Sequence, residues 1–145
     1  MKYISTRGNN QNMTSAQAII AGLAKDGGLF VPESIPQVDM EFIQSLSDLS
    51  YQQRAVKVLS CLLTDYTQEE ITGCVERAYG NGKFDDKAVA PLNIMDDLSV
   101  LELWHGPTSA FKDMALQLLP QLLSTALKKT GEKNQVLILV ATSGD

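Results

Sequence analysis

The chain has 145 residues, of which 44% are hydrophobic and 20% are charged, a composition typical of a soluble globular protein with a real core. Seventeen acidic and twelve basic residues leave a net charge of −5, which disfavours nucleic acid or an anionic membrane surface as a partner. Because no apolar run approaches the ~20 residues of a membrane span and no secretory signal follows Met1, we expect a cytoplasmic protein without a membrane partner.

The first half of the sequence has the pattern of short helices with brief strands at its front edge. A strand is expected over residues 2–5, and another extended segment over residues 29–31 is closed by Pro32. A first helix is expected after Thr14 or Ser15 and should end at Gly27-Gly28. Further helices are expected over residues 39–46, over residues 50–63, and from Thr67 to the glycine-rich break at residues 79–83.

Each of these helices has an apolar stripe that predicts a core-facing side. The first stripe comprises Ala16, Ile19, Ile20, Leu23 and Ala24. The second comprises Tyr51, Ala55, Val58, Leu59, Leu62 and Leu63. The third comprises Ile71, Cys74, Val75 and Ala78, and the hydroxyl of Thr67 followed by Glu70 predicts a capping box at the start of its helix.

The second half of the sequence changes to an α/β pattern after a link over residues 84–90. Two strands are expected over residues 91–95 and 99–104, around a turn at Asp96-Asp97. The helix expected over residues 110–129 contains Pro120, so it is either kinked there or divided into two helices. The continuous apolar run over residues 136–140 predicts a strand buried on both faces, so that residues 99–141 form one βαβ unit.

The two cysteines do not have the spacing of a metal site. Cys61 and Cys74 lie in different helical patterns, without a CxxC or Cys/His arrangement. Buried free thiols are therefore a better interpretation than a disulfide, and no metal is expected.

Lys112 is the candidate reactive residue. It follows the turn at Gly106-Pro107 and opens a Leu-rich helix, where the positive end of the helix dipole disfavours an ammonium group. In a water-poor place its neutral amine would be a nucleophile able to form a Schiff base with a carbonyl compound. The alternative from spacing alone is an ordinary exposed lysine beside Asp113.

Three segments carry a resemblance to a known family. Residues 104–108 (WHGPT) with residues 110–113 (AFKD) resemble the cofactor-lysine motif of the longer-chain threonine synthases, which are fold type II pyridoxal-phosphate enzymes. Residues 3–8 (YISTRG) with residues 22–32 are similar to the opening signature of that family. Residues 141–145 (ATSGD) look like the start of its substrate loop.

The resemblance implies a fold and a reaction. The fold would be α/β, with a small, mainly helical domain over residues 1–83 followed by the first βαβ portion of a tryptophan-synthase-β-like catalytic domain over residues 84–145. The reaction would be the conversion of O-phospho-L-homoserine and water to L-threonine and phosphate. Lys112 would hold pyridoxal 5'-phosphate as an aldimine and would move protons at the substrate.

The resemblance also implies roles for neighbouring residues. Thr142, Ser143 and Gly144 would hold the carboxylate of the substrate, and Asp145 would lie near the cofactor's ring hydroxyl, although a plain strand-ending turn explains these residues as well. Thr108 is expected to cap the Lys112 helix and Asp113 to offset its positive end, so that both orient Lys112. His105 fits either acid–base work or simple packing in the loop, and Arg7 fits a structural contact.

Two rival interpretations remain at this point. One is a related phospho-lyase that acts on another phosphorylated amino acid, and the other is a non-catalytic, mostly helical interaction domain. Because the chain stops directly after its most apolar run, we also expect it to be a truncated piece of a longer protein, inactive by itself.

Overall fold

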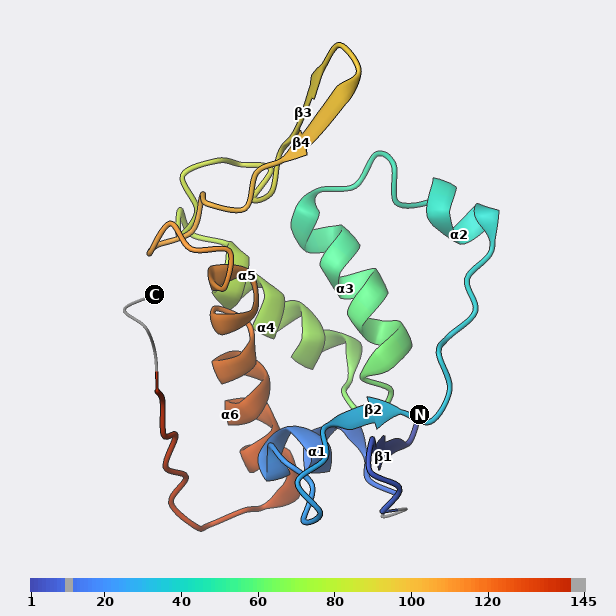
Figure 1. Ribbon diagram of the computed structural model, residues 1–145, viewed down its shortest axis with the longest axis vertical. Helices are drawn as coiled ribbons and strands as arrows, with labels where there is room; N and C mark the ends of the chain where they lie inside the picture. Colours follow the sequence, from blue (N-terminus) through green and yellow to red (C-terminus); the bar gives the residue numbers. More distant parts are fainter. Residues whose placement is uncertain (10–11, 142–145) are drawn as a thin grey trace.

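Helix α4, Gln68–Tyr79, is the centre of the hydrophobic core. In this computed structural model, which describes residues 1–9 and 12–141, α4 packs against α3, Tyr51–Leu62, and against α6, Leu119–Thr130 (Figure 1). The stripe predicted for α4 is confirmed, since four of its side chains are at most 1% exposed: Ile71, Cys74, Val75 and Ala78.

The ends of α4 follow from its sequence. The Thr67 hydroxyl accepts a hydrogen bond of 3.2 Å from the Glu70 N–H, and the Glu70 carboxylate accepts one of 2.8 Å from the Thr67 N–H. This confirms the predicted capping box, which satisfies two backbone N–H groups that the helix itself leaves without partners. The helix ends at Gly80, inside the predicted break.

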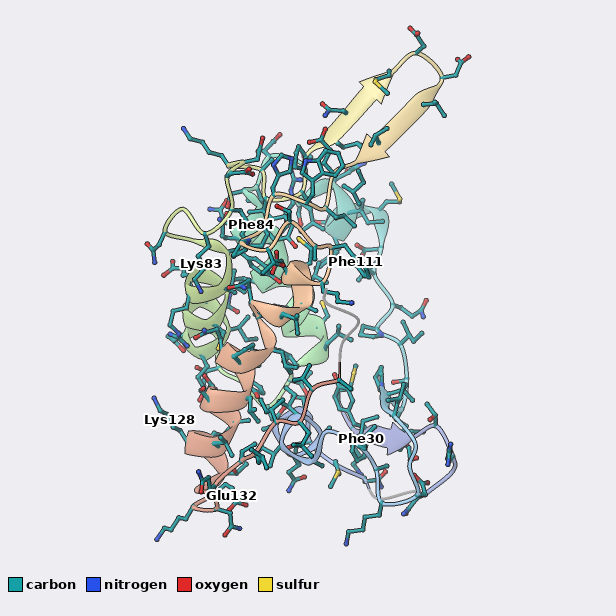
Figure 2. All side chains as sticks on the ribbon, turned by 60° about the vertical axis from the view of Figure 1, so that its left-hand side comes forward. Phe30, Lys83, Phe84, Phe111, Lys128 and Glu132 are labelled. Atoms are coloured by element: carbon teal, nitrogen blue, oxygen red, sulfur yellow. The ribbon has the colours of Figure 1, made fainter. Side chains whose placement is uncertain are left out.

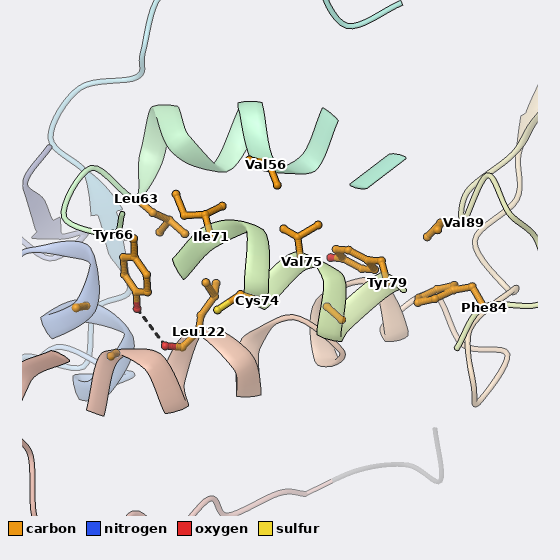
Figure 3. Packing of buried hydrophobic residues seen from close by; sticks show 13 residues of the cluster. Val56, Leu63, Tyr66, Ile71, Cys74, Val75, Tyr79, Phe84, Val89 and Leu122 are labelled. Atoms are coloured by element: carbon orange, nitrogen blue, oxygen red, sulfur yellow. Dashed lines mark hydrogen bonds between the residues drawn. The ribbon is translucent and has the colours of Figure 1, made fainter. Parts of the chain in front are cut away.

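Two tyrosines tie the core to the second half of the chain (Figure 3). Tyr66 donates a hydrogen bond of 3.1 Å to the carbonyl oxygen of Leu122, and Tyr79 packs its ring 5.8 Å from that of Phe84. Burial raises the pKa of both phenols, so they remain neutral donors. Since Phe84, Val89 and Leu122 belong to the same core cluster as α4, one core spans both sides of the boundary predicted at residues 83 and 84. That boundary stays a prediction.

A small antiparallel sheet forms at the N-terminus. Strand β1, Tyr3–Ser5, pairs with β2, Phe30–Pro32, as expected for two short extended segments. The Asp26 carboxylate accepts hydrogen bonds from the Gly28 N–H at 2.9 Å and from the Ser5 hydroxyl at 2.7 Å, and these bonds lower the pKa of Asp26. Arg7 donates to the Asp26 carbonyl oxygen at 3.1 Å. The two halves of the opening signature are therefore joined to each other.

The helices between this sheet and α4 differ in detail from the prediction. Helix α1, Ser15–Ala21, starts at a Thr14 cap as expected but ends at Gly22 rather than at Gly27-Gly28, because Gly22 adopts a left-handed φ of 67°. The chain leaves the helical path there, and Leu23 is 61% exposed instead of buried.

Helices α2 and α3 lie where the pattern places them. Helix α2, Met40–Gln44, starts at Asp39, which caps it. On α3 the prediction is wrong for Val58, which is 44% exposed, whereas Val56 is 9% exposed and faces α4. Val56 was missed because the packing of α3 against its neighbours, and not its own sequence, sets the rotation of the helix around its axis and therefore which residues at the edge of the stripe are buried.

The two strands predicted around Asp96-Asp97 form a hairpin. Strand β3, Leu92–Met95, pairs antiparallel with β4, Leu98–Leu101, and the hairpin projects away from the helices (Figure 1). Its large apolar side chains are 54–74% exposed: Leu92, Ile94, Met95, Leu98 and Leu101.

The helical region after the hairpin is divided in two. Helix α5, Asp113–Leu116, is followed by α6, and Pro120 lies in the first turn of α6, where its missing N–H leaves no helical bond unmade. The second of the two alternatives for Pro120 is therefore confirmed. Gly131, at a left-handed φ of 68°, ends α6 as predicted.

The predicted strand over residues 136–140 is not formed. These residues run extended along the side of α6 without strand pairing, and they are 40–86% exposed (Figure 1). A strand needs a hydrogen-bonding neighbour, and both strands of the hairpin pair only with each other among the described residues. The βαβ prediction is thus wrong for this structure, which combines helices with short antiparallel strands in a mixed α/β architecture.

Within residues 1–9 and 12–141, no helix is long and apolar enough to cross a membrane. No group of three or more metal-binding side chains occurs there either. Both cysteines are free; Cys74 is buried as predicted, but Cys61 is partly exposed.

Candidate active site

The candidate site is the turn over residues 102–113, which connects the hairpin to α5 at one end of the helical body. Figure 2 shows Phe111 near the base of the hairpin, with Phe84 close by. The segment over residues 84–90 contacts this turn, since the N–H of Asp85 donates to the His105 carbonyl oxygen at 3.0 Å. Tyr79 holds the start of α5 by donating a hydrogen bond of 2.6 Å to the Met114 carbonyl oxygen.

His105 lies between two carboxylates at the start of the turn. Its Nδ1 is 2.5 Å from Asp85 Oδ1, and its Nε2 is 2.6 Å from Glu102 Oε2. The bond to Glu102, and next the bond to Asp85, raise the pKa of His105. The indole ring of Trp104 stacks on the imidazole with 5.6 Å between ring centroids. The contacts of His105 thus join two separate parts of the chain, residues 102–105 and the segment that contains Asp85.

The middle of the turn is closed by Asp113. This residue is 2% exposed, and its carboxylate accepts hydrogen bonds from the Thr108 N–H at 2.8 Å and from the Thr108 hydroxyl at 3.0 Å. Gly106 lies directly against it, because a Cβ added at Gly106 would be 2.5 Å from the Asp113 Cβ. Glycine is therefore needed at this position for steric reasons, and Ser109 turns the chain at a φ of 57°.

Thr108 does not cap the Lys112 helix as predicted. In the part of the chain that the structure describes, α5 starts at Asp113, Lys112 occupies the N-cap position, and no side chain caps that helix end. The prediction is wrong because the Thr108 hydroxyl donates to Asp113 itself. The Asp113 carboxylate on α5 thus binds Thr108 in the turn, and these bonds hold together the loop that precedes Lys112.

Lys112 as a whole residue is exposed in this structure, and the expectation of a water-poor amine stays a prediction. Its Nζ lies 5.9 Å from the centroid of the Phe111 ring, within the range of a cation–π contact.

Lys112 nevertheless borders a groove. The groove has a volume of about 780 Å³ and lies between α3 and the segments on either side of the turn. It is mainly apolar, and its lining comprises Tyr51, Arg54, Ala55, Val58, Ala90, Leu101, Leu103, Phe111, Lys112, Met114, Ala115 and Leu116. An amine at the rim of an apolar groove of this size can reach a small carbonyl compound bound there.

Other site predictions have different outcomes. Thr142, Ser143, Gly144 and Asp145 lie outside the described residues. Sequence reasoning missed Asp85 and Glu102 as partners of His105. Asp85 is twenty residues away in a linker without a motif, so no signal in the sequence indicated that contact. Glu102 is only three residues away, but that spacing predicts a contact on a helix and not in an extended segment.

Comparison with known proteins agrees with the family resemblance of the sequence as a whole. A family described as the N-terminus of threonine synthase matches residues 2–79. Threonine synthase from Pseudomonas aeruginosa is 44% identical over all of this chain and 30% of its own length, and the enzyme from Schizosaccharomyces pombe is 38% identical with the same coverage. A crystal structure of pyridoxal-phosphate-bound threonine synthase from Brucella melitensis superimposes with a TM-score of 0.84, at 41% identity, over 91% of this chain and 28% of that one.

This chain thus shares its sequence and its fold with enzymes of amino-acid biosynthesis. The chain belongs to the threonine synthase family. It spans about 30% of the length of the curated relatives that it matches.

Proposed function

We propose that this chain is part of a threonine synthase that converts O-phospho-L-homoserine and water to L-threonine and phosphate with pyridoxal 5'-phosphate. The observation that carries the proposal is Lys112, which has the place of the cofactor lysine in the family motif and borders the apolar groove. The match of the whole chain to threonine synthases at 38–44% identity supports it.

The described residues fit covalent attachment of the cofactor. Lys112 offers a primary amine at the rim of a groove of about 780 Å³, which is within the usual range of about 300–1,000 Å³ for small-molecule sites. When bound, the cofactor would supply an electron sink for negative charge at the substrate's α carbon.

The residues of this chain would do the remaining work around that attachment. Lys112, once released from the cofactor, would carry a proton to and from the substrate carbons. Thr108 and Asp113 would keep the preceding loop in one conformation through their two hydrogen bonds, so that the amine starts from a fixed backbone position.

Two finer assignments belong to the same proposal. Thr142, Ser143 and Gly144 would bind the substrate carboxylate, and Asp145 would lie near the ring of the cofactor. Residues 84–145 would begin the catalytic domain, with residues 1–83 as a separate N-terminal domain.

Spectroscopy of the full-length gene product with pyridoxal phosphate tests the proposal. We expect an imine absorbance band that borohydride removes, and phosphate release from O-phospho-L-homoserine, and we expect Lys112→Ala to abolish both. Lys87→Ala is the matched control, because Lys87 is an exposed lysine in the neighbouring segment and should leave both unchanged. An imine band that survives Lys112→Ala would refute the assignment, and turnover of a different phosphorylated amino acid instead would favour the related phospho-lyase.

A further inference from the structure

The surroundings of His105 require a charged imidazole. Both ring nitrogens face carboxylate oxygens, Nδ1 facing Asp85 at 2.5 Å and Nε2 facing Glu102 at 2.6 Å. An ionised carboxylate only accepts hydrogen bonds, whereas a neutral imidazole has one donor nitrogen and one acceptor nitrogen. A neutral ring would therefore place a lone pair against one of the two carboxylates, and only the imidazolium can donate to both.

The two partners of His105 belong to different segments that the imidazolium joins. Asp85 lies directly after the core residue Phe84, and its own N–H donates to the His105 carbonyl oxygen. Glu102 follows β4, its N–H donates to the Pro91 carbonyl oxygen at 2.9 Å, and its carboxylate also accepts from the Asn93 side chain. His105 thus ties the base of the hairpin to the core-anchored segment over residues 84–90.

This tie lies at the entrance of the turn that leads to Lys112. Gly106 follows His105 and packs against Asp113, which in turn is the residue after Lys112. Contacts at both ends therefore determine the path of residues 105–113. If the side-chain contacts of His105 are released, the side of the turn that faces Asp85 keeps only the backbone bond from the Asp85 N–H, while the Thr108–Asp113 bonds remain.

We propose that His105 is the positioning residue of the cofactor lysine: as an imidazolium bridging Asp85 and Glu102, it holds the turn that presents Lys112 to the groove. The inference rests on the proposed function of Lys112 for its catalytic meaning, but the charge of His105 can be measured without it. His105 does not touch the reacting groups and acts only through the turn.

The sign of the pH dependence follows from the pairing. Asp85 and Glu102 are the charged groups that face His105, with Trp104 stacked on the ring. Because the pKa of His105 is raised, the tie is fully present below the unfolded value of about 6.5 and is lost as pH rises through the higher folded value. The turn should therefore be held below that folded value and loosen as pH rises above it.

The charge of His105 can be measured by NMR of the 145-residue chain without ambiguity, since His105 is the only histidine in its sequence. We expect its ring signals to titrate above pH 6.5, and we expect Glu102→Gln to lower the midpoint, because it removes the largest cause of the raised pKa. Asp85→Asn, at a side chain that is 77% exposed, should lower the midpoint without a risk to folding. Emission of Trp104, the only tryptophan, should change with the same midpoint. A midpoint at or below 6.5 that neither variant moves would overturn the inference.

The link to Lys112 is tested on the full-length protein with pyridoxal phosphate and borohydride trapping, with the labelled lysine identified by mass spectrometry. We expect His105→Gln to slow labelling of Lys112 at pH 6.5 by about tenfold to a hundredfold, the effect of a displacement of about 1 Å. At a pH well above the midpoint measured by NMR, the labelling rate of the wild type should approach that of the variant. His105→Arg, which stays charged and can donate to both carboxylates, should restore labelling at both pH values. Lys87→Gln, which removes an exposed positive charge from the neighbouring segment, should label like the wild type.

The outcomes separate the two proposals. Labelling of other lysines in the wild type, with Lys112 unlabelled, would refute the proposed function. Labelling of Lys112 at the same rate in wild type and His105→Gln at both pH values would leave the proposed function intact and overturn the positioning role of His105.

Discussion

Replacement of Gly106 by alanine tests whether the turn before Lys112 is held by close packing. The added Cβ would lie 2.5 Å from the Asp113 Cβ and 2.6 Å from its Oδ2, whereas nonbonded carbon atoms pack at about 3.5–4.0 Å. Gly106 is outside the left-handed region, so the substitution introduces a steric clash and no backbone strain. Either the Asp113 carboxylate or the turn must move by about 1 Å.

The size of the effect follows from what Asp113 would lose. Its two hydrogen bonds from Thr108 involve a charged acceptor, and such bonds contribute about 1.5–3 kcal/mol each. Thr108 is exposed, so its donors can return to water and part of that loss is recovered. We therefore expect Gly106→Ala to lower the free energy of unfolding by about 1–3 kcal/mol, as in other overpacked sites, and the melting temperature by about 3–9 °C.

Urea denaturation of the 145-residue chain measures this change, and a double-mutant cycle identifies its cause. In an Asp113→Ala background the obstacle is gone, so Gly106→Ala should cost much less, with a coupling of about 0.5–3 kcal/mol. Gly73→Ala is the matched control, because Gly73 lies inside α4 beside the movable end of Arg77 and alanine there is favoured by about 0.5–1 kcal/mol. An effect of Gly106→Ala below about 0.5 kcal/mol, or the same effect with Asp113 removed, would refute the steric argument.

Three further predictions concern the rest of the fold. Ile71→Ala should lower the free energy of unfolding by about 2–5 kcal/mol in urea denaturation, because Ile71 is 1% exposed. Ile94→Ala, at a side chain that is 74% exposed, is the control and should change the free energy of unfolding by no more than about 0.5 kcal/mol. Equal effects of the two substitutions would contradict the assigned core. Thr67→Ala should cost about 0.5–2 kcal/mol by the same method through loss of the α4 cap, and a neutral result would show that the capping bonds contribute nothing. Burial alone would raise the pKa of Asp65, but hydrogen bonds from the Ser15 hydroxyl and the Ala16 N–H outweigh it and lower that pKa. The stabilisation of the fold by the Asp65 carboxylate is therefore present above pH ~3.9 and is lost as pH falls through the lower folded value. Asp65→Asn should therefore flatten the acid side of a stability–pH curve, and an unchanged acid slope would contradict this.

The local sequence was sufficient for features whose causes lie within a few residues. The Thr67–Glu70 capping box, the four-residue stripe of α4 and the glycine that ends α6 depend on short-range geometry, and all three agree with the structure. The hairpin around Asp96-Asp97 follows in the same way from a turn between two apolar segments. The cofactor-lysine motif was equally visible, since its residues are contiguous, although its function stays a proposal.

Only the tertiary structure decided features that depend on distant partners. An apolar run such as residues 136–140 becomes a strand only beside another strand, and among the described residues it has none, so it is extended and exposed. The exposure of Lys112 likewise depends on what packs against α5, which its own sequence does not specify. His105 is charged because Asp85, twenty residues away, meets it opposite Glu102, and such a contact is created by the path of the chain through space. The sequence alone thus determined the elements and the family motif, whereas the long-range packing of those elements determined burial, pairing and charge.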